Sequence, residues 1–335
     1  MYKGIVIGCG NIGALLEADE KRAKPRTHAS ALLGNPKTSL VALVDVNEES
    51  LKKAKAFFPD TPAYTDLQKC LAEIRPDIAI VATDSANHAS IIGQCAESGV
   101  PMIIGEKPLA HTMSDARNIS AVLKKHGTTF VLNYQRRLFP LFREVREMIR
   151  RGSLGAIQQV TCYYSNGAHN NAGHTIDALL FLLGERIVAV HGVLNRRNVT
   201  HPDNDPNIDG ILITEGGITI TLQSFDQKYF GIHEICIFGA QSAAILHEYG
   251  YALNIVPLKH SDLTGLLQFS YPDAQNKHDI RSMTADALAE VVAVHEEKRE
   301  PRTGIKNGME TLAVLEALSE SARQNGARVA VAYTV

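Results

Sequence analysis

Short apolar runs alternate with amphipathic stretches in the part of the chain before residue 150. Apolar residues at helical spacing fill the amphipathic stretches, and two of these end in Gly99 and Gly127, which favour helix termination. Strands buried on both faces that alternate with helices predict a parallel, doubly wound sheet. The predicted strands lie at 3–8, 39–45, 77–83, 100–104 and 128–133.

The pattern changes after a helix that is predicted to end at Gly152. Longer runs with period-two alternation follow, Gly216-Gly217 marks a hairpin turn, and two helices close the chain. We expect an open, mostly antiparallel sheet with helices on one face, so the fold class is α/β followed by α+β. The expected domains are 1–133 and 134–335, and the final helix is a candidate to pack back on the first domain. The second domain's predicted strands lie at 157–165, 187–195, 208–225 and 233–240, and its helices at 284–298 and 308–326.

A G-x-G-x-x-G motif follows the first predicted strand. Glycines cluster in many turns, but here a strand precedes them, a helical pattern follows, and the second strand ends in an acid. In a dinucleotide site the first glycine makes the turn, the second admits a pyrophosphate, and the third allows close helix–strand packing. The sequence therefore predicts a phosphate loop made of Gly8, Gly10, Asn11, Ile12 and Gly13.

Asp45 is the acid at the end of the second strand, where it could accept both ribose hydroxyls of an adenosine. It lies 32 residues after Gly13, further than the usual interval of about 20, and the charged segment 17–27 accounts for the excess. Val46 and Asn47 supply no cation for a 2′-phosphate, which favours NAD over NADP. The alternative for Asp45 is a role as a helix N-cap alone.

Glu106, Lys107 and Pro108 follow the apolar run 100–104, close to where an open α/β sheet binds its ligands. Pro108 restricts the backbone and removes a donor, so Lys107 is held at a sharp turn. This position motivates the hypothesis of a cis Lys107–Pro108 bond. Taken alone, Lys107 would be interpreted as a surface lysine between a strand and a helix, and only its neighbours change that interpretation.

Several motifs resemble, in their order along the chain, those of the glucose-fructose oxidoreductase, inositol dehydrogenase and rhizopine catabolism protein family. The resemblance covers about 1–330, and Glu-Lys-Pro and the Gly-His-x-x-Asp segment at 173–177 are its most specific marks. The motifs are VIGCGNIG, VATDSANH, IIGEKPLA, NYQRRLFPLFREVREMIRRGSLG, NNAGHTIDALLFLLG and REPRTGIKNGMETLAVLEAL.

The resemblance implies that Lys107 lies beside the nicotinamide and that His174 of the second domain exchanges a proton with the substrate. Hydride leaves a C–H bond only as the adjacent O–H loses its proton, so a group that titrates near neutrality must touch that oxygen. Many relatives have an aspartate four residues before this histidine, where this chain has Asn170, which cannot take a proton. Asp177 either holds the imidazole or favours the helix N-terminus. The alternative for His174 is an ordinary histidine at a helix start.

Further contacts are implied by the resemblance, although His88 is equally an ordinary first-turn residue and Arg137 and Arg143 are expected to face solvent. Because 17–27 runs into His28, we expect this segment to border the substrate pocket. The polar loops 195–207 and 271–279 could also reach a ligand. Implied cofactor contacts are the phosphate loop with Asp45, Thr83, His88, Glu106 and Lys107. Implied substrate contacts are His28, Asn133, Tyr134, Arg136, Asn170 and His174.

Composition and charge narrow the classes of function. The 335 residues carry a formal net charge of −2 without long runs of either sign, which gives no electrostatic footprint for nucleic acid or anionic membrane. No signal-peptide pattern or bilayer-length apolar stretch occurs, so we expect a cytoplasmic protein with its five cysteines reduced. His169 and His174 lack a third ligand at useful spacing, so no metal is expected. Cys9 is expected to serve packing rather than nucleophilic attack.

Together these features predict an enzyme that transfers hydride between NAD and a secondary hydroxyl, or its ketone, of a sugar, cyclitol or sugar nucleotide. The resemblance also implies that the protein forms a homodimer or a homotetramer. Two alternatives stay open: a reductase of a non-sugar substrate of the dihydrodiol or biliverdin type, and a non-catalytic dinucleotide-binding regulator. Lys107 and His174 argue against the regulator, whereas Asn170 in place of aspartate keeps it open.

Overall fold

The chain divides into two compact units in a computed structural model that describes residues 1–197, 205–261, 264–270 and 284–333. The first unit contains 1–138 and 280–309, and the second contains 139–279 and 310–335. The boundary near residue 133 expected from the sequence therefore lies close to the break at 138, but 280–309 belong to the first unit and not to the second. The predicted ligand loop 271–279 lies outside the described residues.

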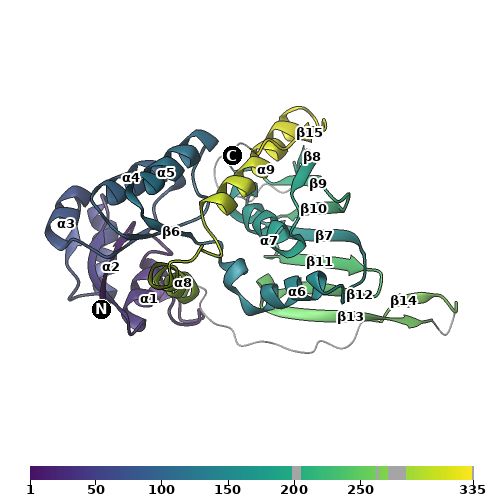
Figure 1. Cartoon of the computed structure of the whole chain (residues 1–335), viewed down its shortest axis with the longest axis horizontal. Helices are drawn as coiled ribbons and strands as arrows, with labels where there is room; N and C mark the ends of the chain where they lie inside the picture. The colour runs from purple at the N-terminus through teal and green to yellow at the C-terminus, as the bar shows by residue number, and fades with distance from the viewer. Residues whose placement is uncertain (198–204, 262–263, 271–283, 334–335) are drawn as a thin grey trace. The chain divides into compact units, whose positions relative to one another are not determined.

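A six-stranded parallel sheet forms the centre of the first unit (Figure 1), and its strand order is β3-β2-β1-β4-β5-β6. This confirms the doubly wound sheet, and the order reverses beside β1 and β4, where such folds bind ligands at the carboxyl ends of the strands. The pattern missed β3 because this strand has only two residues. The strands are β1 (Tyr2–Ile7), β2 (Thr38–Val44), β3 (Ala63–Tyr64), β4 (Ile78–Val81), β5 (Met102–Gly105) and β6 (Thr129–Leu132).

Six α-helices of the described residues belong wholly to this unit, and the last of them comes from far along the sequence. Its buried Leu288 and Val291 join the same apolar core as Val6 and Ile104. The predicted stop signals are confirmed, since Gly99 and Gly127 follow helices with φ of +80° and +65°, a region that glycine enters without strain. The helices are α1 (His28–Gly34), α2 (Glu48–Phe57), α3 (Leu67–Ile74), α4 (His88–Glu97), α5 (Met113–His126) and α8 (Thr284–Glu297).

The helix that follows the phosphate loop is split into two pieces. A first turn begins at the glycines and runs into the short 3-10 helix η1 (Leu15–Ala18), and α1 begins only at His28. The backbone N–H groups of His28 and Ala29 nevertheless donate to the carbonyls of Ile12 and Gly13, at 3.0 and 3.1 Å. In an unbroken α-helix those bonds belong to residues 16 and 17, because each N–H bonds four residues back. Residues 16–27 are thus an in-register insertion into that helix, and they include the segment 17–27 that the sequence indicated as an insertion.

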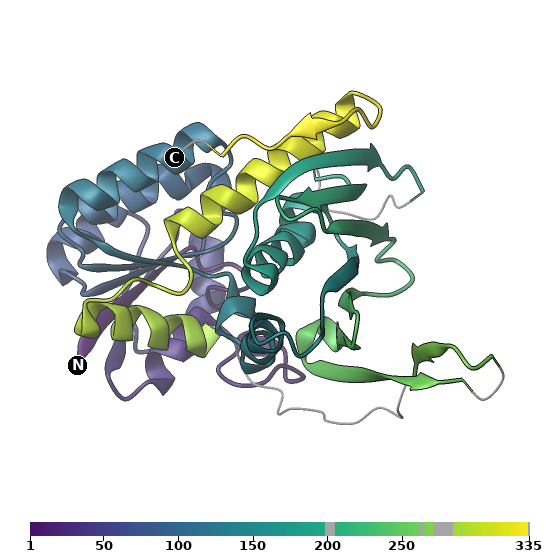
Figure 2. The ribbon, with the colours of Figure 1, turned by 45° about the vertical axis from the view of Figure 1, so that its right-hand side comes forward.

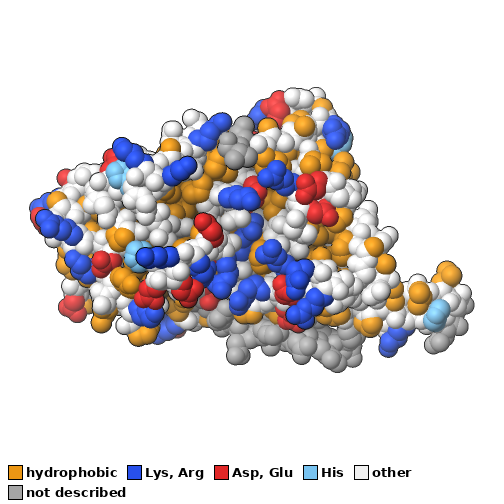
Figure 3. All heavy atoms as spheres, viewed as in Figure 1, with side chains coloured by type: hydrophobic (Ala, Val, Ile, Leu, Met, Phe, Trp, Pro, Cys, Tyr) orange, Lys and Arg blue, Asp and Glu red, His pale blue; other side chains and the backbone are white. Residues whose placement is uncertain are grey.

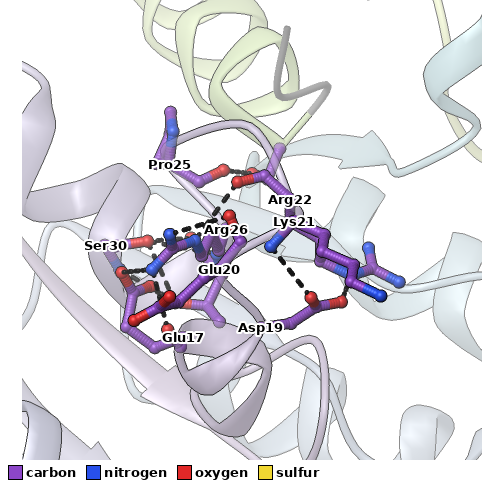
Figure 4. A network of polar contacts seen from close by, with 10 residues as sticks. Glu17, Asp19, Glu20, Lys21, Arg22, Pro25, Arg26 and Ser30 are labelled. Carbon is purple, nitrogen blue, oxygen red and sulfur yellow. Dashed lines mark hydrogen bonds and ion pairs between the residues drawn. The ribbon is translucent and has the colours of Figure 1, made fainter. Parts of the chain in front are cut away.

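Arg26 holds the inserted segment together (Figure 4). Its guanidinium donates to the carbonyl oxygens of Glu17, Glu20 and Arg22, at 3.0, 3.4 and 3.2 Å. Thr27 then caps α1 through a reciprocal pair of bonds with Ser30. The segment is therefore ordered by its own polar contacts and delivers His28 into α1.

A nine-stranded sheet runs through the second unit (Figure 2), and among its described strands only the β7–β10 pair is parallel. This confirms the mostly antiparallel prediction, and Gly217 (φ +88°) makes the predicted hairpin turn. Four strands, β12 to β15, were not predicted. The strands are β7 (Ile157–Ser165), β8 (Ile187–Leu194), β9 (Ile208–Thr214), β10 (Thr219–Phe225), β11 (His233–Gly239), β12 (Ser242–His247), β13 (Ala252–His260), β14 (Leu267–Phe269) and β15 (Val329–Ala330). The helices are α6 (Pro140–Arg150), α7 (Gly173–Leu183) and α9 (Ile305–Arg323), whose first turn belongs to the first unit.

Candidate functional site

The phosphate loop has the space that a dinucleotide needs. Gly8 has φ +94°, and a Cβ there would lie 2.5 Å from the Ala82 carbonyl oxygen, so only glycine fits. A Cβ on Gly13 would collide with the Gly8 carbonyl oxygen. Gly10, by contrast, has nothing within 4 Å of where its Cβ would be. The outer glycines are required by packing, and the middle one leaves open the approach that a pyrophosphate takes. Beside it, Asn11 is exposed and Ile12 is half-buried.

Asp45 links the end of β2 to this loop. One carboxylate oxygen accepts the Cys9 backbone N–H at 2.8 Å, and the other accepts the Asn47 N–H at 2.9 Å. The N-cap of α2 is Asn47, whose side chain accepts from Glu49 and Ser50, so the alternative that Asp45 serves only as this cap does not hold.

A cavity of about 570 Å³ opens beside Asp45 at the carboxyl ends of β1, β2 and β4. Thr83, which the resemblance implies as a cofactor contact, lines this cavity. Thr65, Gln68 and Asn87 line it as well and were missed because β3, which aligns the 65–68 segment, has no clear sequence pattern. No Lys or Arg occurs among the described residues that line this cavity. The space therefore suits an adenosine ribose with free hydroxyls better than one with a 2′-phosphate.

The Glu106-Lys107-Pro108 turn is anchored by a buried carboxylate. The Lys107–Pro108 bond is cis, as predicted. One oxygen of Glu106 lies 2.8 Å from His28 Nε2 and accepts Asn133 Nδ2 at 2.6 Å, while the other accepts the Lys107 backbone N–H at 3.1 Å. Burial by itself would raise the pKa of Glu106, but the hydrogen bond and charge of His28, the Asn133 bond and the Lys107 charge together lower it. The turn thus holds a carboxylate anion at the residue that precedes Lys107.

His28 and Asn133 each have one buried polar atom that makes no hydrogen bond to the described residues. His28 is fully buried, and its Nδ1 has no hydrogen-bond partner among the residues that the structure describes; the same holds for the Oδ1 of buried Asn133. A buried donor or acceptor without a partner is costly. Since both atoms belong to the cluster around Glu106, they are suited to hold a polar group of a ligand at this edge of the sheet.

Other residues of the first unit that were expected to contact the cofactor or the substrate are buried. His88 is fully buried with its ring nitrogens 3.2 and 3.0 Å from the carbonyl oxygens of Leu109 and Thr83, so it ties the turn after β4 to the turn after β5. This is the structural alternative that the sequence left open for it. Tyr134 and Arg136 are buried as well. Arg137 was expected in solvent but is buried too, because it lies in the 3-10 helix η3 (Gln135–Leu138) that packs against α8.

The second unit carries the proposed proton-transfer residues on one continuous helical segment. A π-helical turn, η4 (Ala168–Ala172), contains Asn170 and runs directly into α7, which contains His174 and Asp177. Asn170 Nδ2 donates to the Asn166 carbonyl at 3.1 Å. Asp177 is fully buried and lies beyond the first turn of α7, where a helix dipole has little effect. The burial and position of Asp177 therefore favour contact of its carboxylate with a neighbouring side chain over an interaction with the helix dipole.

The described part of the chain contains neither an activated cysteine nor a cluster of metal ligands. All five cysteines are buried and free, and burial, with the negative charge of Asp45, raises the pKa of Cys9 to about 12. Three or more His, Cys, Asp or Glu side chains do not gather to hold a metal anywhere among the described residues. Within the same residues, each helix is too short or too polar to cross a membrane. Lys and Arg side chains lie next to Asp and Glu on the face in Figure 3, as expected for a net charge of −2.

Comparison with known proteins places these features in one family. The sequence model of the oxidoreductase family with an NAD-binding Rossmann fold matches residues 3–134, and the model of the GFO/IDH/MocA C-terminal domain matches residues 142–244. The chain belongs to the GFO/IDH/MocA family of oxidoreductases. It is an NAD-dependent oxidoreductase, which the phosphate loop, Asp45 and the adjoining cavity fit.

Relatives of this GFO/IDH/MocA protein extend over its whole length. Inositol 2-dehydrogenase 2 of Paenarthrobacter aurescens is 24% identical over 98% of both chains. Inositol 2-dehydrogenase of Rhizobium meliloti is 25% identical over 71% of this chain and 73% of its own. Among solved structures, levoglucosan dehydrogenase in complex with NADH has a TM-score of 0.81 at 17% identity, covering 99% of this chain and 100% of its own. At that identity the structural likeness establishes the fold.

Proposed function

We propose that the protein is an NAD-dependent dehydrogenase that acts on a secondary hydroxyl, or the corresponding ketone, of a sugar, cyclitol or sugar nucleotide. The observation that carries the proposal is the Glu106-Lys107-Pro108 turn. Its carboxylate is buried and held by His28 and Asn133, and its lysine follows a strand of the sheet that carries the phosphate loop. A lysine on a turn that is anchored in this way suits a reaction centre, whereas a surface lysine needs no such anchor.

The proposed reaction consists of a hydride transfer and a proton transfer. Bound NAD supplies the acceptor for the hydride. Lys107 stabilises the negative charge that develops on the substrate oxygen, and His174 takes the proton that the oxygen releases. In the reverse direction His174 returns that proton. Asn170 orients a hydroxyl or the imidazole by hydrogen bonding, and it takes no part in moving the proton.

The names of the relatives support the substrate class. Besides the two inositol 2-dehydrogenases, a WlbA dehydrogenase from Bordetella pertussis with a similar fold was solved with NADH and UDP-GlcNAcA, at 19% identity, TM-score 0.78 and 99% coverage of both chains. Cyclitols and sugars share the H–C–O–H group that this chemistry requires. The homo-oligomeric state and the cytoplasmic location stay predictions.

The test is the change in near-ultraviolet absorbance when the protein is mixed with NAD or NADP and a panel of inositols, free hexoses and sugar nucleotides. Lys107→Met and His174→Gln should each lower kcat by about 10²-fold or more. Lys125→Met and His126→Gln, which alter exposed residues at the end of α5, are the matched controls and should leave kcat unchanged.

Cofactor binding separates the alternatives. NADH binding can be followed by the fluorescence of NADH, which is excited at wavelengths where protein side chains do not absorb. Turnover with NAD that both variants lose supports the proposal. NADH binding without turnover of the panel would point to a non-sugar substrate or to a regulator, and undiminished turnover in Lys107→Met would refute the assigned chemistry.

A further inference from the structure

Four consecutive backbone N–H groups at the start of the π-helical turn all donate to one tripeptide from another part of the chain. Gly167 donates to Asn207 Oδ1 at 2.8 Å, and Ala168 donates to the Pro206 carbonyl oxygen at 3.3 Å. The next two donors, His169 and Asn170, bond to the two carboxylate oxygens of Asp205, both at 2.8 Å. The start of a helical segment leaves four such donors without partners inside the helix, so Asp205-Pro206-Asn207 satisfies the complete set.

The fit between the turn and the tripeptide is close. Gly167 has φ +92°, and any side chain there would collide with the Asp205 carboxylate. Asp205 is itself 9% exposed. Both features show that the two segments are packed against each other, since a loosely capped helix would require neither a buried carboxylate nor a glycine opposite it.

The sheet in turn holds the tripeptide. Asn207 directly precedes β9, and the fully buried Tyr164 of β7 clamps the first residue of that strand. The Tyr164 hydroxyl accepts the Ile208 N–H at 2.7 Å and donates to the Ile208 carbonyl at 2.8 Å. The Asn207 carbonyl also accepts the Asn195 N–H at 3.0 Å. A displacement of the turn relative to the sheet would therefore break several bonds together.

We propose that Asp205-Pro206-Asn207 positions the proton-transfer segment, with Asp205 as the principal positioning residue. The proposal rests on the proposed function, because the segment that is held contains Asn170 and leads into His174. His174 lies four residues after the last capped N–H, which corresponds to about 6 Å along a helix. A shift of the capped end is thus transmitted directly to the imidazole. The polar loop 195–207, which the sequence marked as able to reach a ligand, acts here through its last three residues.

Asp205→Ala is the test, with Asp209→Ala as the matched control. Asp209 is a neighbouring carboxylate that accepts from the backbone N–H and hydroxyl of Ser224 and from Asn195, and none of these hydrogen bonds involves the turn. We expect Asp205→Ala to lower kcat by about 10²-fold, since a misplacement near 1 Å is worth that much. The dissociation constant of NADH should stay unchanged, because NADH binds the other unit. Asp209→Ala should leave kcat within a few-fold.

Asp205→Asn provides rescue and guards against a variant that fails to fold. Its single amide oxygen can accept one of the two N–H groups, so kcat should lie between the wild type and Asp205→Ala. Equal loss of kcat in Asp205→Ala and Asp209→Ala, with unchanged kcat in Asp205→Asn, would show that Asp205 only stabilises the fold and would overturn the proposal.

Amide hydrogen exchange tests the cap without any substrate. Exchange at His169 and Asn170 should be faster in Asp205→Ala than in the wild type and unchanged in Asp209→Ala. If no substrate is turned over while exchange responds in this way, the proposed function fails and the positioning of the segment stands. If exchange at these two amides does not change, the positioning role is wrong, whatever the substrate.

Discussion

Glu106 shows how a single buried residue organises the first unit's part of the site. Its carboxylate gathers a histidine from α1, an asparagine that follows β6 and the backbone of its own turn. The motif Glu-Lys-Pro could be found in the sequence, and so could the cis bond. The partners could not, because His28 and Asn133 are 78 and 27 residues away and only the fold brings them to the carboxylate.

Glu106→Gln should reveal the pH dependence of this anchor. The pKa of Glu106 is lowered in the folded protein, so its stabilisation is fully present above the unfolded pKa of about 4.3 and is lost as pH falls through the folded value. We expect the variant to lose about 2–3 kcal/mol of unfolding free energy near neutral pH, because charged hydrogen bonds are removed from a buried site. Urea unfolding measured over a series of pH values gives this difference.

The direction in which the stability difference changes with pH is the outcome that tests this prediction. The gap between wild type and Glu106→Gln should shrink as pH falls below the unfolded pKa of about 4.3 and through the lower folded value, where the wild-type carboxylate takes up a proton. Glu73→Gln, which alters an exposed carboxylate on α3, is the control and should show a small gap at every pH. A Glu106→Gln gap that stays constant down to acid would mean that charge on Glu106 does not stabilise the fold.

Among the elements, regular strands and helix ends were predictable and interruptions were not. The five long strands of the first sheet follow from apolar runs that only a doubly buried strand explains. The two-residue β3 carries no such pattern, and β12 to β14 alternate too weakly to be separated from loops. The segment 17–27 was recognised as an insertion from its charge and from the position of Asp45. Its register within the helix depends on the bonds of His28 and Ala29, which only the structure shows.

Deleting residues 16–27 should join Leu15 to His28 and leave one continuous helix. The N–H groups of His28 and Ala29 already occupy the positions that residues 16 and 17 would have. Shortening a loop changes the free energy of unfolding by about 1 kcal/mol or less, so the variant should fold and bind NADH as the wild type does. Since we expect the segment to border the substrate pocket, turnover should change. Thermal unfolding and NADH fluorescence measure the first two outcomes.

A deletion that is one residue shorter supplies the control. Removing 16–26 leaves Thr27 in the position that His28 should occupy, and it rotates α1 by about 100° so that its buried face turns away from the sheet. This variant should be much less stable than the twelve-residue deletion. If both deletions unfold alike, the insertion is not in register with the helix.

At the scale of the whole molecule, the chain returns to the first unit after completing most of the second. The apolar pattern of 284–298 correctly predicted a helix, but a pattern states only that one face is buried and not which element covers it. The structure shows α8 in contact with β5, β6 and α1. The final helix was the expected candidate to pack back on the first domain, but most of α9 belongs to the second unit, and it is α8, with only the start of α9, that belongs to the first.

The fragment 1–138 should therefore be unable to fold alone, although it contains all six strands of the first sheet. Without α8 it would expose the apolar surface that Leu288 and Val291 cover. Joining 280–309 to it through a flexible linker should restore cooperative urea unfolding and NADH binding. The same fusion with Val291→Asp should not, because a charge would then be buried without a partner. Cooperative unfolding and full NADH affinity in 1–138 by itself would show that the first unit does not depend on the returning segment.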